Sequence, residues 1–170
     1  MMKMHLIRMG EEGVAAAEMA LVAPLLGILM FGALEVGNYF WDEHMVVKSV
    51  RDGARFAARQ SFASMPCGGP AANEAQIKNV TQYGKPTVSA GDKPHLHYWT
   101  NPLTVAVTID CYDNSGASGT QIYEGVYSSR SDVPRVTVSA SVPYSPLLGT
   151  ISFFRGASLN ASSQATVFGI

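Results

Sequence analysis

The sequence predicts an α+β fold: a long N-terminal α-helix, apolar at its start, continues into an exterior domain with a small antiparallel β-sheet packed on the helix. Three observations predict it. No charged side chain occurs from Met19 to Leu34, and with its apolar neighbours this run reaches the roughly 20 residues needed to cross a bilayer. A period of 3.6 residues then continues in the stretch after Gly37. Three later segments alternate apolar and polar residues with a period of two, which is typical of half-buried strands.

Charges on the two sides of the apolar run predict its orientation. Lys3 and Arg8 precede the run, whereas the charges that follow Asp42 are of mixed sign. The positive-inside bias therefore places the N-terminus in the cytoplasm and the rest of the chain outside. Glu35 closes the run near the expected membrane boundary. We expect its carboxylate to reach outward to water as an interfacial group, with a buried contact to a partner as the less favoured alternative.

A cleavage signal lies ahead of the apolar run and not behind it. The segment "ALEVGNYFW" after the run offers no small, uncharged site for signal peptidase. Gly13, followed by the small or apolar residues from Val14 to Ala17 and then Glu18, looks like the processing signal of type IV prepilins. Cleavage after Gly13 would create an ammonium group on Val14, and the carboxylate of Glu18 one helical turn away would neutralise it or its counterpart on a neighbouring subunit. Glu18 also suits the first turns of a helix, where the dipole favours acids.

A longer match carries a family resemblance. The segment "AAAEMALVAPLLGILMFGALEVGNYFWDEHMVVKSVRDGARFAARQ" resembles the N-terminal part of TadE-like minor pilins of the tight-adherence (Tad, or Flp) pilus system. The ending "VTVSASVPYSPLLGT…LNASSQATV" is also similar to that of the family. Major Flp pilins usually carry Tyr after the glutamate, where this chain has Met19, so the resemblance is to minor pilins. The matching features are Glu18, Pro24, the Phe31-Gly32 step, Glu35, Gly37 and the "RDGARFAA" of residues 51–58.

The resemblance implies a pilin-like organisation. We expect a cytoplasmic leader at 1–13, a transmembrane helix at 14–36, an exterior continuation of the helix at 37–60 and an exterior α+β domain at 61–170. The implied partners are a prepilin peptidase, other Tad pilins and minor pilins, an inner-membrane assembly platform and membrane lipid. The implied location is the bacterial inner membrane, crossed once, with the C-terminal domain in the periplasm, or the extracellular pilus. The implied role is assembly or initiation of the pilus, with its adhesion and secretion functions.

Small residues form a stripe along one face of the apolar helix. Ala16, Ala20, Ala23 and Gly27 recur at spacings of three and four residues. Such a stripe lets a second helix approach closely in lipid, and we favour this helix-packing role over that of an Ala-rich anchor without a partner. Pro24 removes one backbone hydrogen bond and is expected to kink the segment.

Beyond the membrane the helix is expected to run to near Gln60. Its charged residues fall largely opposite an apolar face, which should pack on the exterior domain. Gly53 weakens the helix and predicts a close approach, such as that of a strand. The residues from Tyr39 to Trp41 lie where an aromatic belt would meet the headgroups. The apolar face consists of Tyr39 or Phe40, Val46, Val47, Val50, Ala54, Ala57 and Ala58.

The exterior domain is expected to hold a second helix and three strands. The helix runs from about Ala71 to Tyr83, with Ile77, Val80 and Tyr83 inward, and stops at Gly84. The inward faces of the strands are Leu103, Val105, Val107, Ile109 and Cys111 in the first, Val136, Val138, Ala140, Val142 and Tyr144 in the second, and Leu159, Ala161, Ala165 and Val167 in the third.

The segment between the first two strands, residues 112–132, is rich in Gly, Ser, Asn and Asp and is expected to be a surface loop. The two cysteines, Cys67 and Cys111, are far apart in sequence. A disulfide between them is favoured in an exterior compartment, and two buried free thiols are the alternative.

Composition and motifs argue against other classes of function. A net charge of −1 and 15% charged residues provide no basic surface for nucleic acid. The sequence has no P-loop, nucleophile elbow or dinucleotide fingerprint, so we expect no enzyme and no cofactor. Asp92, His95 and His97 could hold a metal, but surface histidines are the favoured interpretation and we expect no metal site. The alternative function is a membrane-anchored exterior binding or enzymatic domain with an uncleaved helix.

Overall fold

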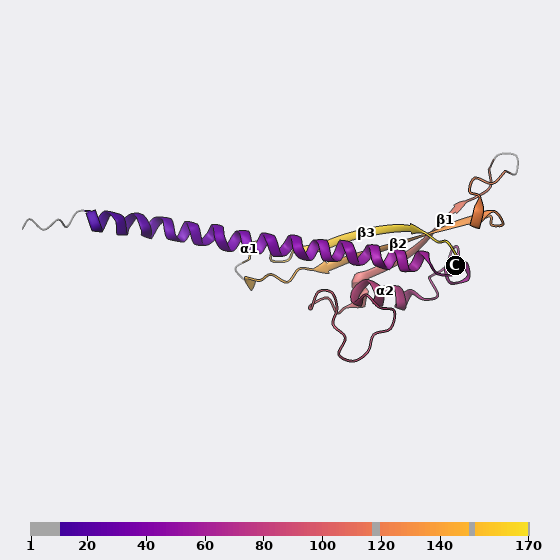
Figure 1. The fold of residues 1–170 in the computed structure, drawn as a ribbon, viewed down its shortest axis with the longest axis horizontal. Helices are drawn as coiled ribbons and strands as arrows, with labels where there is room; N and C mark the ends of the chain where they lie inside the picture. Colours follow the sequence, from indigo (N-terminus) through magenta and orange to yellow (C-terminus); the bar gives the residue numbers. More distant parts are fainter. Residues whose placement is uncertain (1–10, 117–119, 150–151, 170) are drawn as a thin grey trace, which may run out of the picture.

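A computed structural model describes residues 11–116, 120–149 and 152–169 of the chain. Its long helix, α1 (Glu11–Ala58), projects from a small α+β head, and only its C-terminal half is packed (Figure 1). This is the fold class predicted from the sequence. The head contains α2 (Glu74–Tyr83), the strands β1 (Val105–Asp113), β2 (Asp132–Pro143) and β3 (Ser158–Thr166), and the short 3-10 helices η1 (Phe62–Ser64), η2 (Pro102–Thr104) and η4 (Gly125–Tyr127).

Helix α1 runs without a break through Pro24. It ends two residues before the expected Gln60, and the amide of Phe168 near the C-terminus donates to the carbonyl of Ala58 at 2.8 Å. That bond satisfies one of the carbonyl groups that a helix end leaves free. The end of the chain is therefore attached to the end of the helix.

The sheet has the strand order β1-β2-β3, and both pairs are antiparallel. Val107 pairs with Val138, which pairs with Ser163. Helix α1 contacts β2 and β3, and α2 contacts α1 and β1, so both helices cover the same face of the sheet (Figure 1). The other face carries small polar residues, as the period-two alternation predicts for a sheet with one solvated side.

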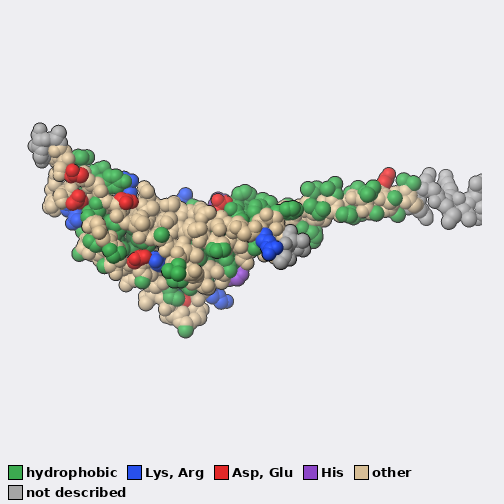
Figure 2. All heavy atoms as spheres, turned by 180° about the vertical axis from the view of Figure 1, so that it is seen from behind, with side chains coloured by type: hydrophobic (Ala, Val, Ile, Leu, Met, Phe, Trp, Pro, Cys, Tyr) green, Lys and Arg blue, Asp and Glu red, His purple; other side chains and the backbone are tan. Residues whose placement is uncertain are grey.

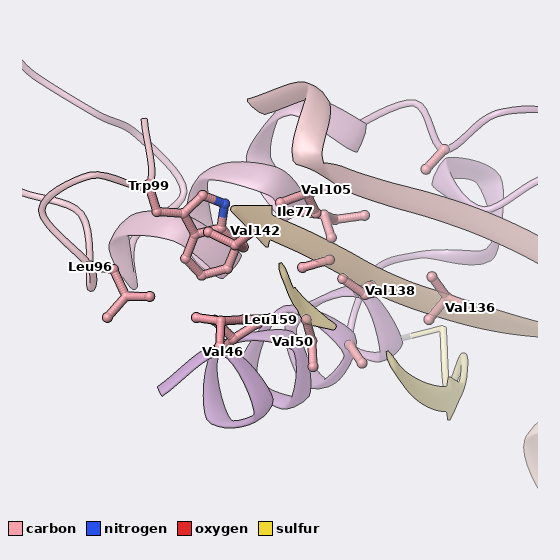
Figure 3. Close-up of a cluster of buried hydrophobic side chains, with 14 of the residues drawn as sticks. Val46, Val50, Ile77, Leu96, Trp99, Val105, Val136, Val138, Val142 and Leu159 are labelled. Carbon is pink, nitrogen blue, oxygen red and sulfur yellow. The ribbon is translucent and has the colours of Figure 1, made fainter. Parts of the chain in front are cut away.

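The core lies between this sheet face and the two helices. Val46 and Val50 of α1 face Val138 and Leu159 of the sheet (Figure 3). Trp99 is also buried, and its ring N–H donates to the hydroxyl of Thr104 at 2.7 Å. The apolar face predicted for the C-terminal part of α1 is therefore the face that packs in the head.

Local expectations are confirmed in most of the head. Helix α2 stops at Gly84, which has a φ of 73° and caps the helix in the left-handed region. Leu103 was expected on the inward face of the first strand, and this is wrong. It lies in η2 and is 84% exposed, because Pro102 starts a helical turn and the strand begins only at Val105.

Gly53 has a packing reason, as expected, but the close neighbour is a helix. A Cβ added at Gly53 would overlap the hydroxyl oxygen of Thr81 in α2, and Val138 of β2 lies 3.5 Å away. Glycine therefore allows α1 and α2 to approach each other closely.

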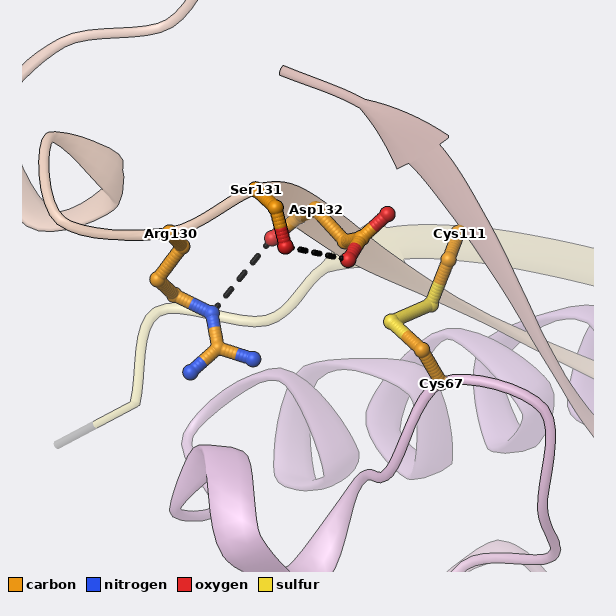
Figure 4. Close-up of a disulfide and its surroundings, with 5 residues drawn as sticks. All are labelled: Cys67, Cys111, Arg130, Ser131 and Asp132. Atoms are coloured by element: carbon orange, nitrogen blue, oxygen red, sulfur yellow. Dashed lines mark hydrogen bonds between the residues drawn. A yellow bond between two sulfur atoms is a disulfide. The ribbon is translucent and has the colours of Figure 1, made fainter. Parts of the chain in front are cut away.

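A disulfide joins Cys67, in the connector after α1, to Cys111 of β1, with 5.7 Å between their Cα atoms (Figure 4). The structure thus has the bonded form of the two alternatives. The bond ties the edge strand β1 to the segment that leaves α1.

Candidate functional site

Most of the N-terminal half of α1 is an apolar surface that no other described residue covers. Its large apolar side chains, from Val14 to Leu34, are exposed, and they line the narrow projection in Figure 2. By length and composition, α1 is the one helix among the described residues that could cross a membrane. Exposed apolar surface of this extent needs lipid or another helix to cover it.

The residues of the predicted processing site lie in the first turns of α1. Gly13, Val14 and Glu18 are exposed. The bond between Gly13 and Val14 lies near the start of the helix, where the first amide groups have no intrahelical partner, so local unwinding costs little. Most of the predicted leader 1–13 lies outside the described residues. Cleavage stays a prediction.

The stripe of small residues is bare for most of its length. Ala16, Ala20 and Ala23 are exposed and contact nothing in the head. Gly27 is half-buried because it lines an apolar groove of about 530 Å³ between α1 and the segment after β2. The groove is lined by Pro24, Gly27, Ile28, Phe31, Gly32, Leu148 and Phe153.

The side chain of Glu35 is buried and does not reach outward as expected. The sequence favoured a carboxylate reaching outward to water, but the side chain is 1% exposed and belongs to a hydrogen-bonded cluster. Tyr144 and Ser152 donate their hydroxyl hydrogens to Oε1 at 3.1 and 3.0 Å, and the amide of Leu148 donates to Oε2 at 3.0 Å. The segment after β2 folds back over this level of α1 and removes the carboxylate from solvent. We call Glu35 and these three donors the Glu35 clamp.

Neighbouring residues of α1 reinforce the clamp. Asn38 donates to the hydroxyl of Tyr144 at 2.8 Å, and burial raises the pKa of Tyr144. Tyr39 was expected in an aromatic belt, but its ring instead stacks on Phe154 with centroids 4.8 Å apart. Phe40 and Trp41 do remain exposed.

About two turns beyond Glu35 along α1, Asp42 is buried as well. Tyr98 donates its hydroxyl hydrogen to Asp42 Oδ2 at 2.6 Å. Burial, together with this bond to a carboxylate, raises the pKa of Tyr98. Two acids of α1 are thus held by tyrosines of the head, and no local sequence pattern indicates either pair.

The described parts of the loop of residues 112–132 lie at the end of the head away from the bare helix, and one side chain joins several of their backbone groups. The side-chain amide of Asn114 donates to the carbonyls of Tyr123, Tyr127 and Arg130 at 3.0–3.1 Å and accepts from the amide of Tyr123. In the same loop, the guanidinium of Arg130 lies over the ring of Phe62. Its Nε donates to the carbonyl of Asp132 (Figure 4).

The three residues considered for a metal have other partners. Asp92 forms an ion pair with Lys85 and accepts from the amide of Ser89. His95 lies beside Gly84, and burial lowers its pKa, whereas His97 packs against Tyr98. Within the described part of the chain, no group of three or more His, Cys, Asp or Glu side chains could hold a metal ion.

A helix long and apolar enough to cross a membrane, with a small α+β head folded on its C-terminal half, suggests a membrane-anchored protein. Residues 13–55 match the model of the family described as TadE-like protein, so this segment is similar to that family. This match confirms the resemblance predicted for the N-terminal part of the chain, and it supports a protein of the Tad pilus system. No curated protein and no solved structure matches the chain. The matched segment includes Glu35, whereas its three donors lie outside it.

Proposed function

We propose that this chain is a minor pilin, or pseudopilin, that a prepilin peptidase cleaves after Gly13 and that takes part in assembly or initiation of a Tad pilus. The observation that carries the proposal is the coincidence of two features in one TadE-like segment. The Gly13–Glu18 signal stands at the start of α1, and the helix that follows it is apolar and bare. A structural role, without catalysis, uses both features.

Cleavage would expose an ammonium group on Val14 at the cytoplasmic edge of the membrane. Glu18 lies four residues further along the helix, about 6 Å in axial rise and on the same face. Its carboxylate would neutralise the new charge, or the corresponding charge of an adjacent subunit. An unpaired charge at this depth is costly, so the pair favours an orderly helix N-terminus.

Assembly would then use the bare half of α1. Ala16, Ala20 and Ala23 offer a surface that another helix can approach closely, with van der Waals contact as the driving force in lipid. Other pilins and minor pilins of the same system supply such helices, and an inner-membrane platform would bring them together. In this proposal the head is periplasmic before assembly and is carried outward if the subunit enters the pilus.

Mass spectrometry of the mature protein from its host tests the cleavage directly. We expect an N-terminus at Val14. Gly13→Leu should leave the full precursor, while the control Gly37→Leu should be processed normally, since Gly37 is also in α1 with open space at its Cβ position. A mature chain that still starts at Met1 would contradict the proposal.

Shearing of cells tests the pilus association. We expect the protein in the sheared pilus fraction or, in cells without the protein, a loss of pili. Glu18→Gln should be cleaved normally but should assemble poorly, because it removes the charge without changing the shape. Wild-type pili in cells that carry only Glu18→Gln would contradict the role given to this carboxylate.

A further inference from the structure

An apolar foot extends from the head beside the membrane-spanning part of α1. The foot consists of residues 145–149 and 152–155, which follow β2 and lie along α1 near its middle (Figure 1). Leu147 and Phe153 point away from the core and are 64% and 86% exposed. The chain from Tyr144 to Ser158 contains no acidic residue, and its one cation, Arg155, is exposed.

We propose that the foot is a second membrane contact: Leu147 and Phe153 enter the leaflet on the side of the head, and Arg155 faces the lipid phosphates. The inference rests on the membrane anchoring of α1 that the proposed function requires. It adds a lipid-binding surface on the head, separate from the helix that spans the membrane.

The position of the foot is fixed by the protein itself. Glu35 accepts hydrogen bonds from Leu148 and Ser152, so both arms of the foot are held on α1. Leu148 and Phe153 also form one wall of the groove whose other wall is α1 between Pro24 and Gly32. The foot therefore lies at the level of residues that are themselves apolar and exposed.

Helix geometry places this level at the membrane boundary. The 20 residues from Gly13 to Gly32 span about 30 Å at a rise of about 1.5 Å per residue, which is the thickness of the hydrocarbon core. The foot then meets the outer part of one leaflet. Its irregular backbone cannot enter hydrocarbon without losing hydrogen bonds to water, so only the side chains penetrate, to about 5–10 Å as in other interfacial elements.

Charge and shape favour lipid over a second protein helix as the occupant. One cation without an acid, next to exposed Leu and Phe side chains, suits a surface of phosphate groups above acyl chains. The Glu35 clamp fits the same setting, because its three donors are satisfied within the protein and the carboxylate is kept away from lipid.

A fluorophore sensitive to polarity tests the proposal in the full chain in phosphatidylglycerol and phosphatidylethanolamine vesicles. Because Cys67 and Cys111 are bonded to each other, a single introduced cysteine can be labelled. The test position is Phe153→Cys. Leu25→Cys, 57% exposed in the anchor, reports insertion of α1, and Ile122→Cys, 59% exposed in the distal loop, is the aqueous control. Lipids with quenchers at shallow or deep positions report depth.

We expect blue-shifted emission at positions 153 and 25, with several-fold stronger quenching of position 153 by the shallow quencher and of position 25 by the deep one. Position 122 should emit as in water. If position 153 behaves like position 122 while position 25 is quenched by lipid, the foot proposal is wrong and the anchor stands. If position 25 is not quenched either, both are wrong. A blue shift at 153 that depends on protein density and not on lipid quenchers would identify a second protein as the occupant and also overturn the proposal.

Discussion

Replacing Glu35 by alanine should release the segment after β2 from α1. The substitution leaves three donors, two buried and one partly buried, without their acceptor, and hydrogen bonds to charged groups contribute about 1.5–3 kcal/mol each. Water reaching the vacated site would recover part of this. We expect the local free energy of opening for residues 144–157 to fall by about 4 kcal/mol. Glu35→Gln, which keeps the shape but turns one acceptor into a donor, should cost about half as much.

Hydrogen exchange followed by mass spectrometry, with the full chain in detergent micelles, measures this local opening. The amide of Leu148 is the direct reporter, because it donates to Glu35 Oε2. A loss of about 4 kcal/mol corresponds to exchange about a thousandfold faster, since each 1.4 kcal/mol is tenfold. Amides in the middle of β2 should keep their protection, since their hydrogen bonds to β1 and β3 do not involve Glu35.

Glu43→Ala is the matched control. It removes the same side chain from the same helix, and no hydrogen bond or ion pair to Glu43 occurs within the described residues. If exchange at Leu148 is as slow in Glu35→Ala as in Glu43→Ala, the clamp does not hold the segment and the argument from its geometry fails.

Three further predictions concern the head. Gly53→Ala should lower the urea midpoint of unfolding. The overlap of the new Cβ with Thr81 costs about 1–3 kcal/mol, which outweighs the gain of about 1 kcal/mol in helix propensity. Adding Thr81→Ala to this variant should recover part of the lost stability. Asn114→Asp should make the loop between β1 and β2 sensitive to protease while β2 stays protected, because a carboxylate cannot donate to three carbonyls; equal cleavage rates would contradict this. The ion pair with Lys85 and the hydrogen bond from the Ser89 amide lower the pKa of Asp92. The ionised carboxylate therefore stabilises the segment from Lys85 to Asp92 above the unfolded pKa of about 3.9, and this stabilisation disappears as the pH falls. NMR titration should show a higher pKa for Asp92 in Lys85→Met than in the wild-type chain.

Elements with a regular period could be predicted from the sequence. The alternation of Val136, Val138 and Ala140 identified an inward strand face, and all three are buried. The 3.6-residue period after Gly37 identified the face of α1 that packs on the sheet. In both cases one side of the element packs against a continuous apolar layer, so apolar residues recur along it at a fixed spacing that the local sequence reveals.

Glu35 could not be placed in this way. Its donors Tyr144 and Ser152 are 109 and 117 residues further along the chain, and no local period links a carboxylate to such partners. An acid at the end of an apolar run has an ordinary interpretation at the membrane boundary, which is why the outward orientation was favoured. A hint lay in the segment after β2, where apolar residues occur without the alternation of a strand. Such residues on a surface segment need a neighbour that the segment alone does not identify.

The Glu35 clamp divides α1 into two parts with different physical requirements. Beyond it, residues such as Val46 and Val50 are buried in the head, so their side chains are dictated by the fold. Before it, Ala16, Ala20 and Ala23 have no contact within the described chain, so nothing in the fold accounts for their small size. In the proposed assembly, the need for small side chains at these positions comes from contact with lipid and neighbouring helices. Because the clamp and the foot fix the head against α1 at the boundary of the two parts, a rotation or shift of the helix in the membrane would carry the head with it.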